Sequence, residues 1–181
     1  MTTSDELVVL LDESAQPIGT ALKAEVHTEN TLLHLAFSCH VFDADGRLLV
    51  TRRALGKKTW PGVWTNSFCG HPGPGEDIAD AVVRRAEQEL GMTISTPELV
   101  LPTFRYRAVD ASGVVENEIC PVYTAVAAST PSPRAEEVAE LAWVDPLDLV
   151  AAAELTPFAF SPWITLQLPA LVEAGALPSA G

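Results

Sequence analysis

The stretch from Gly70 to Gly91, GHPGPGEDIADAVVRRAEQELG, decides the fold of this chain. Residues 71–77 include two prolines and two glycines, which predicts a loop. Acidic residues then open a segment with helical periodicity, and the glycine at position 91 is typical of a helix end. The apolar residues of this segment form one stripe: Ile78, Ala81, Val82, Ala86 and Leu90. The stretch therefore predicts a loop followed by an amphipathic helix.

Apolar segments separated by turn signals surround this helix. Strands are predicted at residues 7–14, in a hairpin at 33–55 about the turn Asp43–Gly46, at 63–68, in two long strands within 98–128 joined at Asp110–Gly113, and at 140–145. Residues 129–138 predict a surface loop, and Asp145-Pro146 and Ser161-Pro162 each predict the start of a helix. This order favours an α/β (α+β) sandwich with a mixed sheet over a regular βαβ repeat.

Length and composition are those of a globular protein. The chain has 181 residues, of which 48% are apolar and 19% are charged. We expect one domain over residues 1–181, with a core at about 31–168 and a C-terminal helix end and tail at 169–181. No apolar run is long enough to span a membrane, and the acidic N-terminus lacks the basic region of a signal peptide. We therefore expect a cytoplasmic protein, and a monomer because no coiled-coil pattern is present.

The cysteine and charge patterns exclude further classes. Three cysteines without a CxxC pair predict no disulfide framework. The net charge of −13 argues against binding to nucleic acid or to an anionic membrane surface. All the lysines and arginines precede residue 135, and the rest of the chain carries acidic charges only. Two interpretations stay open at this point: a site for a small anion, or ordinary solvated surface charges.

The helix after residue 77 resembles part of the Nudix box, in which glutamates on one helix hold Mg²⁺ against a diphosphate. The matching positions are Gly70, Glu76, Arg84, Glu87, Glu89 and Gly91. Arg85 and Gln88 stand where that motif has glutamates, and the loss of two carboxylates weakens a clamp for phosphoanhydride hydrolysis. The resemblance implies a Nudix-like α/β/α sandwich with a mixed sheet and extra N- and C-terminal elements. An amphipathic helix with surface charges is the alternative.

A second group of residues has the chemistry of a metal site. Glu116 and Glu118 are two apart on a predicted strand, so both side chains project from one face. Three histidines add imidazole donors: His27, His34 and His71. Such a set suits a divalent cation such as Mn²⁺, Mg²⁺ or Zn²⁺. A lone histidine is more often structural, and the spacing does not show that these residues meet.

Four segments together resemble the type I isopentenyl-diphosphate isomerases, metal-dependent enzymes built on a Nudix-like fold. They are HTENTLLHLAFS, LLVTRRALGKKTWPGVWTNSFCGHP, FRYRAVDASGVVENEICPVY and PFAFSPW. The resemblance extends from about Leu7 to about Leu168. His40 and Phe68 depart from the pattern of the family. The implied function is the interconversion of isopentenyl and dimethylallyl diphosphate in isoprenoid biosynthesis, with a small prenyl diphosphate as the partner.

The resemblance also implies a role for each site residue. A divalent metal, Mn²⁺ or Mg²⁺ with Zn²⁺ as a further choice, would be held by His27, His34, His71, Glu116 and Glu118. A Mg²⁺ that bridges to the diphosphate would be held by Glu89, and the diphosphate itself by Lys23, Arg53, Lys57 and Arg85. The catalytic residues would be an acid/base pair on opposite faces of the alkene, a phenol bonded to the glutamate, and an indole facing the carbocation: Cys69 with Glu118, Tyr106 and Trp163.

This division of roles suits the chemistry. An isolated alkene is a poor base, so it needs a well-placed proton donor, and water would capture a tertiary carbocation. An indole face stabilises a desolvated cation by about 2 kcal/mol without acting as a nucleophile. A metal-bound Glu118 is a better base than acid, so Glu118, Tyr106 and a water on the metal all stay open as proton source.

Two other functions compete with the isomerase. A divergent Nudix pyrophosphohydrolase would share the fold and the diphosphate, but it needs the carboxylates that are missing at Arg85 and Gln88. A non-enzymatic metal- or anion-binding module would account for the histidines and glutamates. It would leave three residues unexplained: Cys69, Tyr106 and Trp163.

Overall fold

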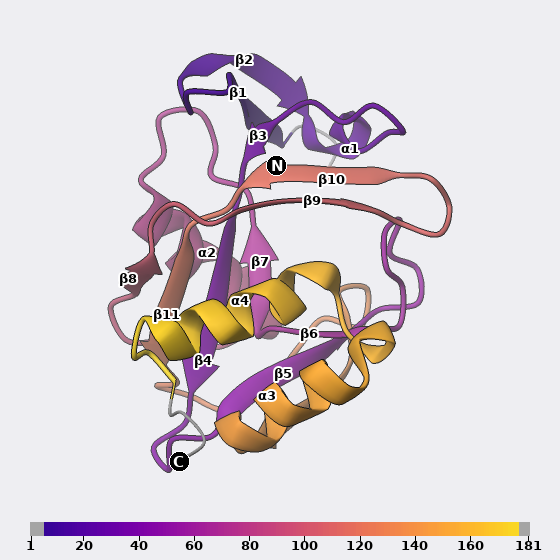
Figure 1. The fold of residues 1–181 in the computed structure, drawn as a ribbon. Helices are drawn as coiled ribbons and strands as arrows, with labels where there is room; N and C mark the ends of the chain where they lie inside the picture. The colour runs from indigo at the N-terminus through magenta and orange to yellow at the C-terminus, as the bar shows by residue number, and fades with distance from the viewer. Residues whose placement is uncertain (1–5, 178–181) are drawn as a thin grey trace.

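The strands form two sheets in the computed structural model, which describes residues 6–177 (Figure 1). The first sheet has the order β2-β1-β3-β10-β9, with β1 at Leu7–Leu11, β2 at Pro17–Leu22, β3 at His34–Leu35, β9 at Arg105–Val109 and β10 at Val115–Ile119. The second has the order β12-β5-β4-β11-β8, with β4 at Phe37–Phe42, β5 at Leu48–Arg53, β8 at Glu98–Leu101, β11 at Val122–Val126 and β12 at Val138–Val144. Two short strands pair with the second sheet: β6 at Trp64–Thr65 pairs with β5, and β7 at Phe68–Gly70 pairs with β4.

The helices are α1 at Lys23–Val26, α2 at Ile78–Leu90, α3 at Pro146–Leu155 and α4 at Pro162–Glu173, with a 3-10 turn η2 at Pro157–Ala159.

Helices cover both faces of the second sheet, with α2 behind it and α3 and α4 in front of it (Figure 1). Alternation along β4 explains the two layers, because successive side chains of a strand point to opposite faces. Cys39 and Val41 belong to the apolar cluster under α2. Ser38 and His40 instead bond to Gln167 of α4. Since β4 runs parallel to β11 and β11 antiparallel to β8, the predicted α/β/α sandwich with mixed strands is confirmed.

The prediction of two long strands within residues 98–128 is wrong. Four strands occupy this segment, because Pro102 and Pro121 interrupt the ladders where proline has no N–H to donate. At each break the chain changes sheets, so β8 and β11 lie in the second sheet and β9 and β10 in the first. The predicted single strand at 63–68 is likewise split into β6 and β7, and the predicted hairpin at 33–55 pairs only at Phe42 and Leu48. The sheet change carries the β9–β10 hairpin across the functional pocket.

The sequence signals at helix ends are confirmed. Asp77 caps α2 by accepting from the N–H groups of the first turn, and Asp145 caps α3 in the same way. Ser161 precedes α4, but its hydroxyl bonds Thr65 at 2.7 Å instead of capping the helix. The elements β2 and α1 were not predicted, and β3 lies within the predicted hairpin but joins the first sheet instead of the second. Part of the predicted tail, 178–181, lies outside the described residues.

Gly91 ends α2 with a left-handed backbone, φ +55°, and a Cβ there would lie 2.6 Å from the carbonyl oxygen of Ser132. We expect Gly91→Ala to lower the free energy of unfolding by more than the about 1–2 kcal/mol that a left-handed conformation costs an L-residue. The matched control is Gly75→Ala, because Gly75 has φ +75° but open space around the Cβ position. Urea unfolding followed by circular dichroism measures both. Equal losses would mean that the segment at Ser132 moves aside without cost.

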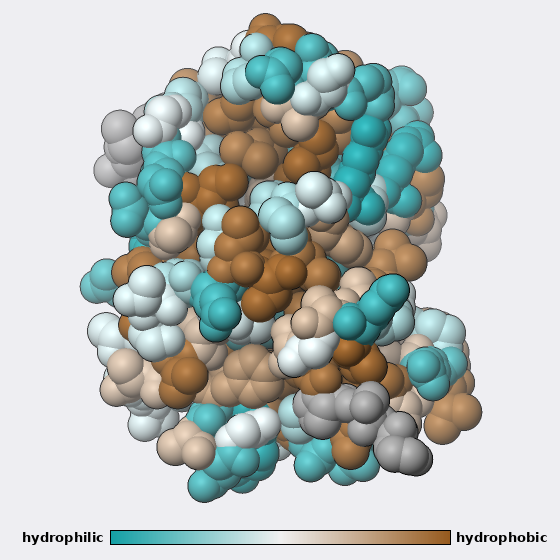
Figure 2. All heavy atoms as spheres, turned by 60° about the vertical axis from the view of Figure 1, so that its left-hand side comes forward, coloured by the Kyte–Doolittle hydropathy of each residue, from teal (hydrophilic) through white to brown (hydrophobic). Residues whose placement is uncertain are grey.

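The surface seen from the β8 edge mixes brown apolar groups with teal hydrophilic ones (Figure 2). Exposed large apolar residues occur along the chain, and Leu99 on β8 and Leu166 on α4 are about half exposed. Apolar side chains exposed in this way are ordinary on a protein surface. Within residues 6–177 no helix has the length and apolar character needed to cross a membrane.

Candidate active site

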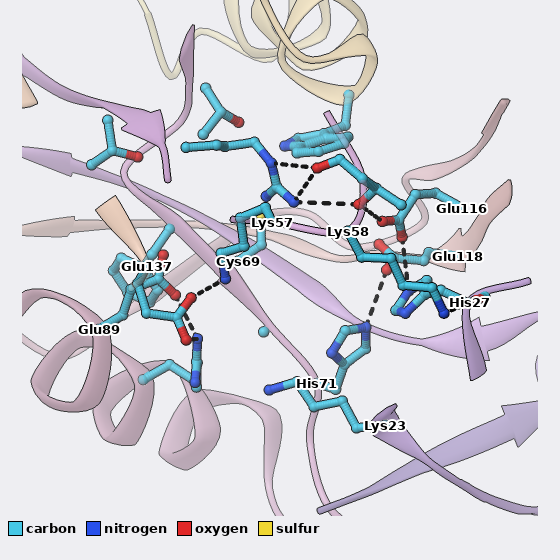
Figure 3. Close-up of a pocket in the computed structure, with 18 of the residues that line it drawn as sticks. Lys23, His27, Lys57, Lys58, Cys69, His71, Glu89, Glu116, Glu118 and Glu137 are labelled. Carbon is cyan, nitrogen blue, oxygen red and sulfur yellow. Dashed lines mark hydrogen bonds and ion pairs between the residues drawn. The ribbon is translucent and has the colours of Figure 1, made fainter. Parts of the chain in front are cut away.

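A pocket of about 590 Å³ opens between the two sheets and α2 (Figure 3). It receives side chains from elements far apart in the sequence: α1 and the residue after it, β5 and the loop that follows, β7, α2, the β9–β10 hairpin, and the start of α4. Its lining contains nearly every residue that the sequence singled out, namely Lys23, His27, Arg53, Lys57, Cys69, His71, Arg85, Glu89, Tyr106, Glu116, Glu118 and Trp163. His34 is fully buried and lies behind this lining.

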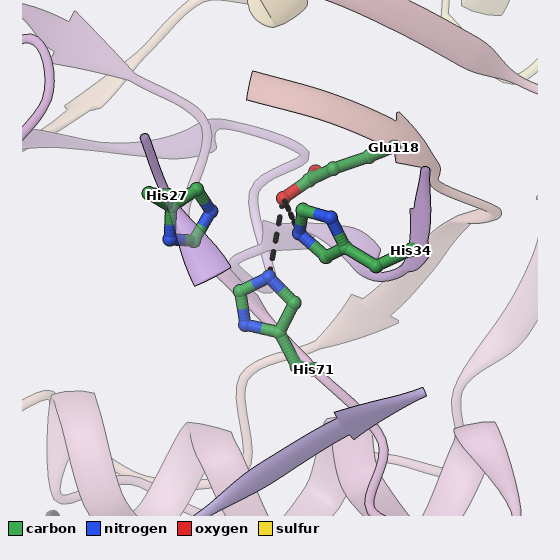
Figure 4. Close-up of side chains that lie close together, drawn as sticks. All are labelled: His27, His34, His71 and Glu118. Carbon is green, nitrogen blue, oxygen red and sulfur yellow. Dashed lines mark hydrogen bonds and ion pairs between the residues drawn. The ribbon is translucent and has the colours of Figure 1, made fainter. Parts of the chain in front are cut away.

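Four side chains form a metal-competent cluster: His27, His34, His71 and Glu118 (Figure 4). One ligand atom from each lies within 4.8 Å of all the others. The cluster arises from strand register, because His34 on β3 pairs with Glu118 on the parallel strand β10. His27 is the residue that ends α1, and His71 directly follows β7.

The hydrogen bonds of the cluster fit a metal. The Nδ1 of His34 lies 2.9 Å from the carbonyl oxygen of Leu32, so it carries the proton and leaves Nε2 free to bind. Three buried imidazole nitrogens make no hydrogen bond of acceptable geometry among the described residues: Nε2 of His27, Nε2 of His34 and Nδ1 of His71. Carboxylate oxygens lie 3.0 Å from the first and 3.4 Å from the second, as they would around a shared cation. Buried polar atoms are rarely left unpaired, so these atoms point to a ligand that completes the site. Imidazole and carboxylate donors are those of a divalent transition metal or Mg²⁺.

Glu116 lies beside the cluster, with its Oε2 3.0 Å from Nε2 of His27. Its other oxygen accepts from the hydroxyl of Thr59 at 2.8 Å, which fixes the carboxylate. Glu116 and Glu118 are both buried and both line the pocket, so the prediction that they share a face of one strand is confirmed. The expected five-residue donor set is therefore brought together, with Glu116 at its edge.

Burial and neighbouring charges set the protonation of the cluster. Burial lowers the pKa of His71 to about 4, so its ring is neutral at pH 7, the form that binds a metal. Burial alone would raise the pKa of Glu118, but the imidazoles of His34 and His71 beside its oxygens hold it well below its usual range. Glu118 is therefore a carboxylate, which makes it a proton acceptor.

Cys69 lies on β7 and lines the same pocket. Its thiol donates to Oδ1 of Asn66 and also lies against the hydroxyl of Ser38, both at 3.3 Å. Burial raises the pKa of Cys69 to about 12, so the sulfur holds its proton at neutral pH. The other two cysteines, Cys39 and Cys120, are buried and unpaired to other cysteines in residues 6–177, as expected for packed residues.

Aromatic side chains build the wall next to these groups. The phenol of Tyr106 donates to Oε2 of Glu118 at 2.9 Å. The Tyr106 ring lies 5.7 Å from that of Trp163, and Trp60 meets Trp163 edge-on at 5.6 Å. The guanidinium of Arg53 lies 5.2 Å from the centre of the Trp163 ring, so this indole already packs against one cation.

Five cations line the pocket, and carboxylates or carbonyls hold each of them; Lys58, which was not predicted for the site, donates to the carbonyl oxygen of His27. Lys23 pairs with Glu6 at 2.7 Å, and Arg85 pairs with Glu89 at 2.6 Å. Lys57 pairs with Glu137, which also lies 3.8 Å from Arg85. Arg53 donates to backbone carbonyls of the loop that follows β5, among them that of Thr59 at 2.8 Å. The four cations predicted to bind a diphosphate therefore lie together on the lining of one pocket.

The sequence interpretation missed four residues of the site: Ser38, Thr59, Asn66 and Glu137. The prediction of a surface loop at 129–138 is wrong at its end, since Glu137 lines the pocket and pairs with Lys57. Only the fold shows that Glu137 and Lys57 meet, because the two residues are 80 positions apart in the sequence. Ser38 and Asn66 lie within segments typical of strands and carry no local signal of function.

The fold and the pocket define a NUDIX domain, and that family matches residues 32–164. A crystal structure from Deinococcus radiodurans superposes with a TM-score of 0.71 at 18% identity, covering 91% of this chain and 98% of that one, which supports the fold alone. The chain is also 65% identical to an isopentenyl-diphosphate Delta-isomerase of Clavibacter sepedonicus, over 99% of this chain and 100% of the relative. A relative of the same name from Clavibacter michiganensis is 70% identical over 94% of this chain and 88% of its own length.

The chain belongs to the NUDIX domain family, in the branch formed by the isopentenyl-diphosphate Delta-isomerases. The resemblance to type I isomerases that four sequence segments carry is thereby confirmed. Arg85, which stands where the Nudix box has a glutamate, lines the pocket as a cation paired with Glu89.

Proposed function

We propose that this chain interconverts isopentenyl diphosphate and dimethylallyl diphosphate in isoprenoid biosynthesis. One observation carries the proposal: a protonated thiol, a carboxylate bonded to a phenol, and an indole face open on the same cavity as five cations and a metal-competent cluster. Relatives that bear the name isopentenyl-diphosphate Delta-isomerase support it at 65% and 70% identity. The proposal keeps the expected cytoplasmic location and monomeric state.

The wall of cations binds the diphosphate, by this proposal. The residues are Lys23, Arg53, Lys57 and Arg85. A diphosphate competes with the carboxylates that now pair with these side chains. Glu89 lies on α2 at the same wall, where it would hold a Mg²⁺ that neutralises charge on the diphosphate. Binding energy from the diphosphate then fixes the reactive tail of the substrate.

The His27, His34, His71, Glu116 and Glu118 set would hold Mn²⁺ or Mg²⁺, with Zn²⁺ as a further choice. When bound, the ion supplies positive charge that orients the Glu118 carboxylate and keeps it ionised. The imidazoles of His34 and His71 lie against Oε1 of this carboxylate. The phenol of Tyr106 donates to its other oxygen, Oε2, at 2.9 Å.

Cys69 and the Glu118–Tyr106 pair move the two protons. The group that holds a proton delivers it to one carbon of the alkene, and the other group accepts the proton released from a different carbon. The reaction is reversible, so the two groups exchange these roles in the opposite direction. The resting protonation suits this division, because burial raises the pKa of Cys69 while its imidazole neighbours hold that of Glu118 low.

Trp163 faces the tertiary carbocation that forms between the two proton transfers. Its ring is 3% exposed, and Tyr106 and Trp60 pack around it, which keeps water from the cation. An indole stabilises positive charge through its face and offers no nucleophilic oxygen that would trap it.

The test uses purified protein, isopentenyl diphosphate and Mg²⁺, with and without Mn²⁺, in deuterated water. We expect proton NMR to show dimethylallyl methyl signals with deuterium incorporated, because protonation and deprotonation exchange with solvent. Phosphorus NMR should show an unchanged diphosphate. Release of phosphate or of a prenyl monophosphate would contradict the proposal and favour a hydrolase.

A further inference from the structure

Asn66 lies between β6 and β7, is fully buried, and does not line the pocket. Its Nδ2 donates to the carbonyl oxygens of Cys39 at 3.0 Å and Phe68 at 2.7 Å. Since a carbonyl oxygen only accepts, these two bonds fix which end of the amide is the donor. The amide oxygen must therefore face the other way.

That oxygen, Oδ1, collects donors from two residues proposed to act on the substrate. The indole Nε1 of Trp163 donates to it at 3.0 Å, and the thiol of Cys69 donates to it at 3.3 Å. The hydroxyl of Thr65 donates to the same oxygen at 2.9 Å and helps to hold it in place. An indole N–H has no acceptor capacity, so it confirms the orientation of the amide from the second side. One buried atom thus connects a proton-transfer group with the aromatic face.

The two partners have few other anchors. Within residues 6–177, the indole N–H of Trp163 makes no hydrogen bond other than the one to Asn66. The sulfur of Cys69 has one further polar contact there, the hydroxyl of Ser38 at 3.3 Å, and Gln167 holds that hydroxyl at 2.9 Å. Without Asn66, the thiol could rotate about its single side-chain bond and the indole would lose its polar tether.

We propose that Asn66 is the positioning residue that sets the Cys69 thiol and the Trp163 indole in register with each other around the substrate alkene. This inference rests on the proposed isomerase function. Asn66 touches no substrate atom by this proposal and acts only through its two partners. The diphosphate wall, in contrast, makes no contact with the Asn66 side chain in the described residues.

The test compares Asn66→Ala with the matched control Ser67→Ala. Ser67 is the next residue, is equally buried, and also makes two bonds to backbone, accepting from Val41 at 2.8 Å and donating to Leu49 at 2.7 Å. Both substitutions remove buried hydrogen bonds from the segment between β6 and β7, so both should lower the melting temperature. Only Asn66→Ala removes a contact to the reacting groups.

We expect Asn66→Ala to lower kcat about 100-fold, the loss typical of a displacement of about 1 Å, with KM for isopentenyl diphosphate changed less than about threefold. Ser67→Ala should keep kcat within about threefold. Equal kcat in the two variants, or a loss confined to KM, would overturn the proposal. A wild-type protein without turnover would instead overturn the proposed function itself.

A second readout does not depend on turnover. In protein labelled with ¹⁵N-tryptophan, Trp163→Phe assigns one indole N–H signal, and we expect that proton to exchange slowly with solvent. In Asn66→Ala it should exchange faster and shift upfield, whereas in Ser67→Ala it should stay in place. Should Asn66→Ala not fold, Asn66→Ser keeps a polar group but is too short to reach both partners. Fast exchange of this proton in the wild type would overturn the proposal.

Discussion

Cys69→Ala is expected to lower kcat by about 10²–10⁴-fold, the range that a positioned acid or base contributes. Alanine removes the sulfur that carries one of the two protons, while the rest of the pocket keeps its contacts. The cations and the metal-competent cluster make no hydrogen bond to Cys69 in the described residues, so KM for the diphosphate should change little. Initial rates with isopentenyl diphosphate give both constants, and circular dichroism confirms the fold.

The matched control for this prediction is Cys120→Ala. Cys120 is also a buried cysteine, and its sulfur lies 3.4 Å from the same Ser38 hydroxyl that contacts Cys69. It does not line the pocket. Its substitution should therefore cost stability without a comparable loss of kcat. Full activity of Cys69→Ala would remove the thiol from the mechanism.

Glu118→Gln should have the second large effect, because one carboxylate serves two tasks. Its oxygens accept from Tyr106 at 2.9 Å, lie 3.1 Å from His71 and lie 3.4 Å from His34. A neutral amide can neither accept the alkene proton nor supply charge to a cation. We expect kcat to fall by about 10²–10⁴-fold and the affinity for Mn²⁺ to fall at least about 10-fold. Steady-state rates and calorimetric titration with Mn²⁺ measure the two effects.

Tyr106→Phe separates the two tasks of Glu118. It removes the phenol but leaves every imidazole and both carboxylates of the metal set. We expect kcat to fall by about 10–100-fold, the worth of one hydrogen bond to a charged group, with unchanged Mn²⁺ affinity.

If Glu118→Gln kept its Mn²⁺ affinity, the carboxylate would act on the proton alone. If it kept both properties, its assignment would be wrong.

The amphipathic helix shows how much of the fold the sequence could predict. Spacing of apolar residues, the acidic residues that open the segment and the Gly91 stop are local signals, and each recurs in α2 as expected. The strands at 98–128 were harder, because a run of strand-forming residues does not say which sheet it joins. Pro102 and Pro121 marked the breaks, but the change of sheet depends on the pairing of β11 with β4 and of β10 with β3, and both partners lie elsewhere in the chain.

The functional site also has features that the sequence predicted and features that only the structure showed. Imidazole and carboxylate side chains predicted a metal site by their chemistry. The four segments that resemble type I isomerases indicated the role of each site residue. Spacing alone did not show that His34 and Glu118 meet, since the parallel register of β3 and β10 places them side by side. Asn66 and Glu137 carried no signal at all, because amide and carboxylate side chains are common on surfaces and only their burial and partners distinguish them.

The sequence by itself determined the secondary-structure signals, the acidic balance and the list of reactive side chains, because these depend on residue type and on short spacings. The resemblance of four segments to type I isomerases indicated the family. Only the tertiary structure decided which side chains share one cavity, that Glu137 pairs with Lys57, and that one amide joins Cys69 to Trp163. Such contacts join residues up to 97 positions apart, and their geometry is set by sheet register and packing that no local pattern encodes.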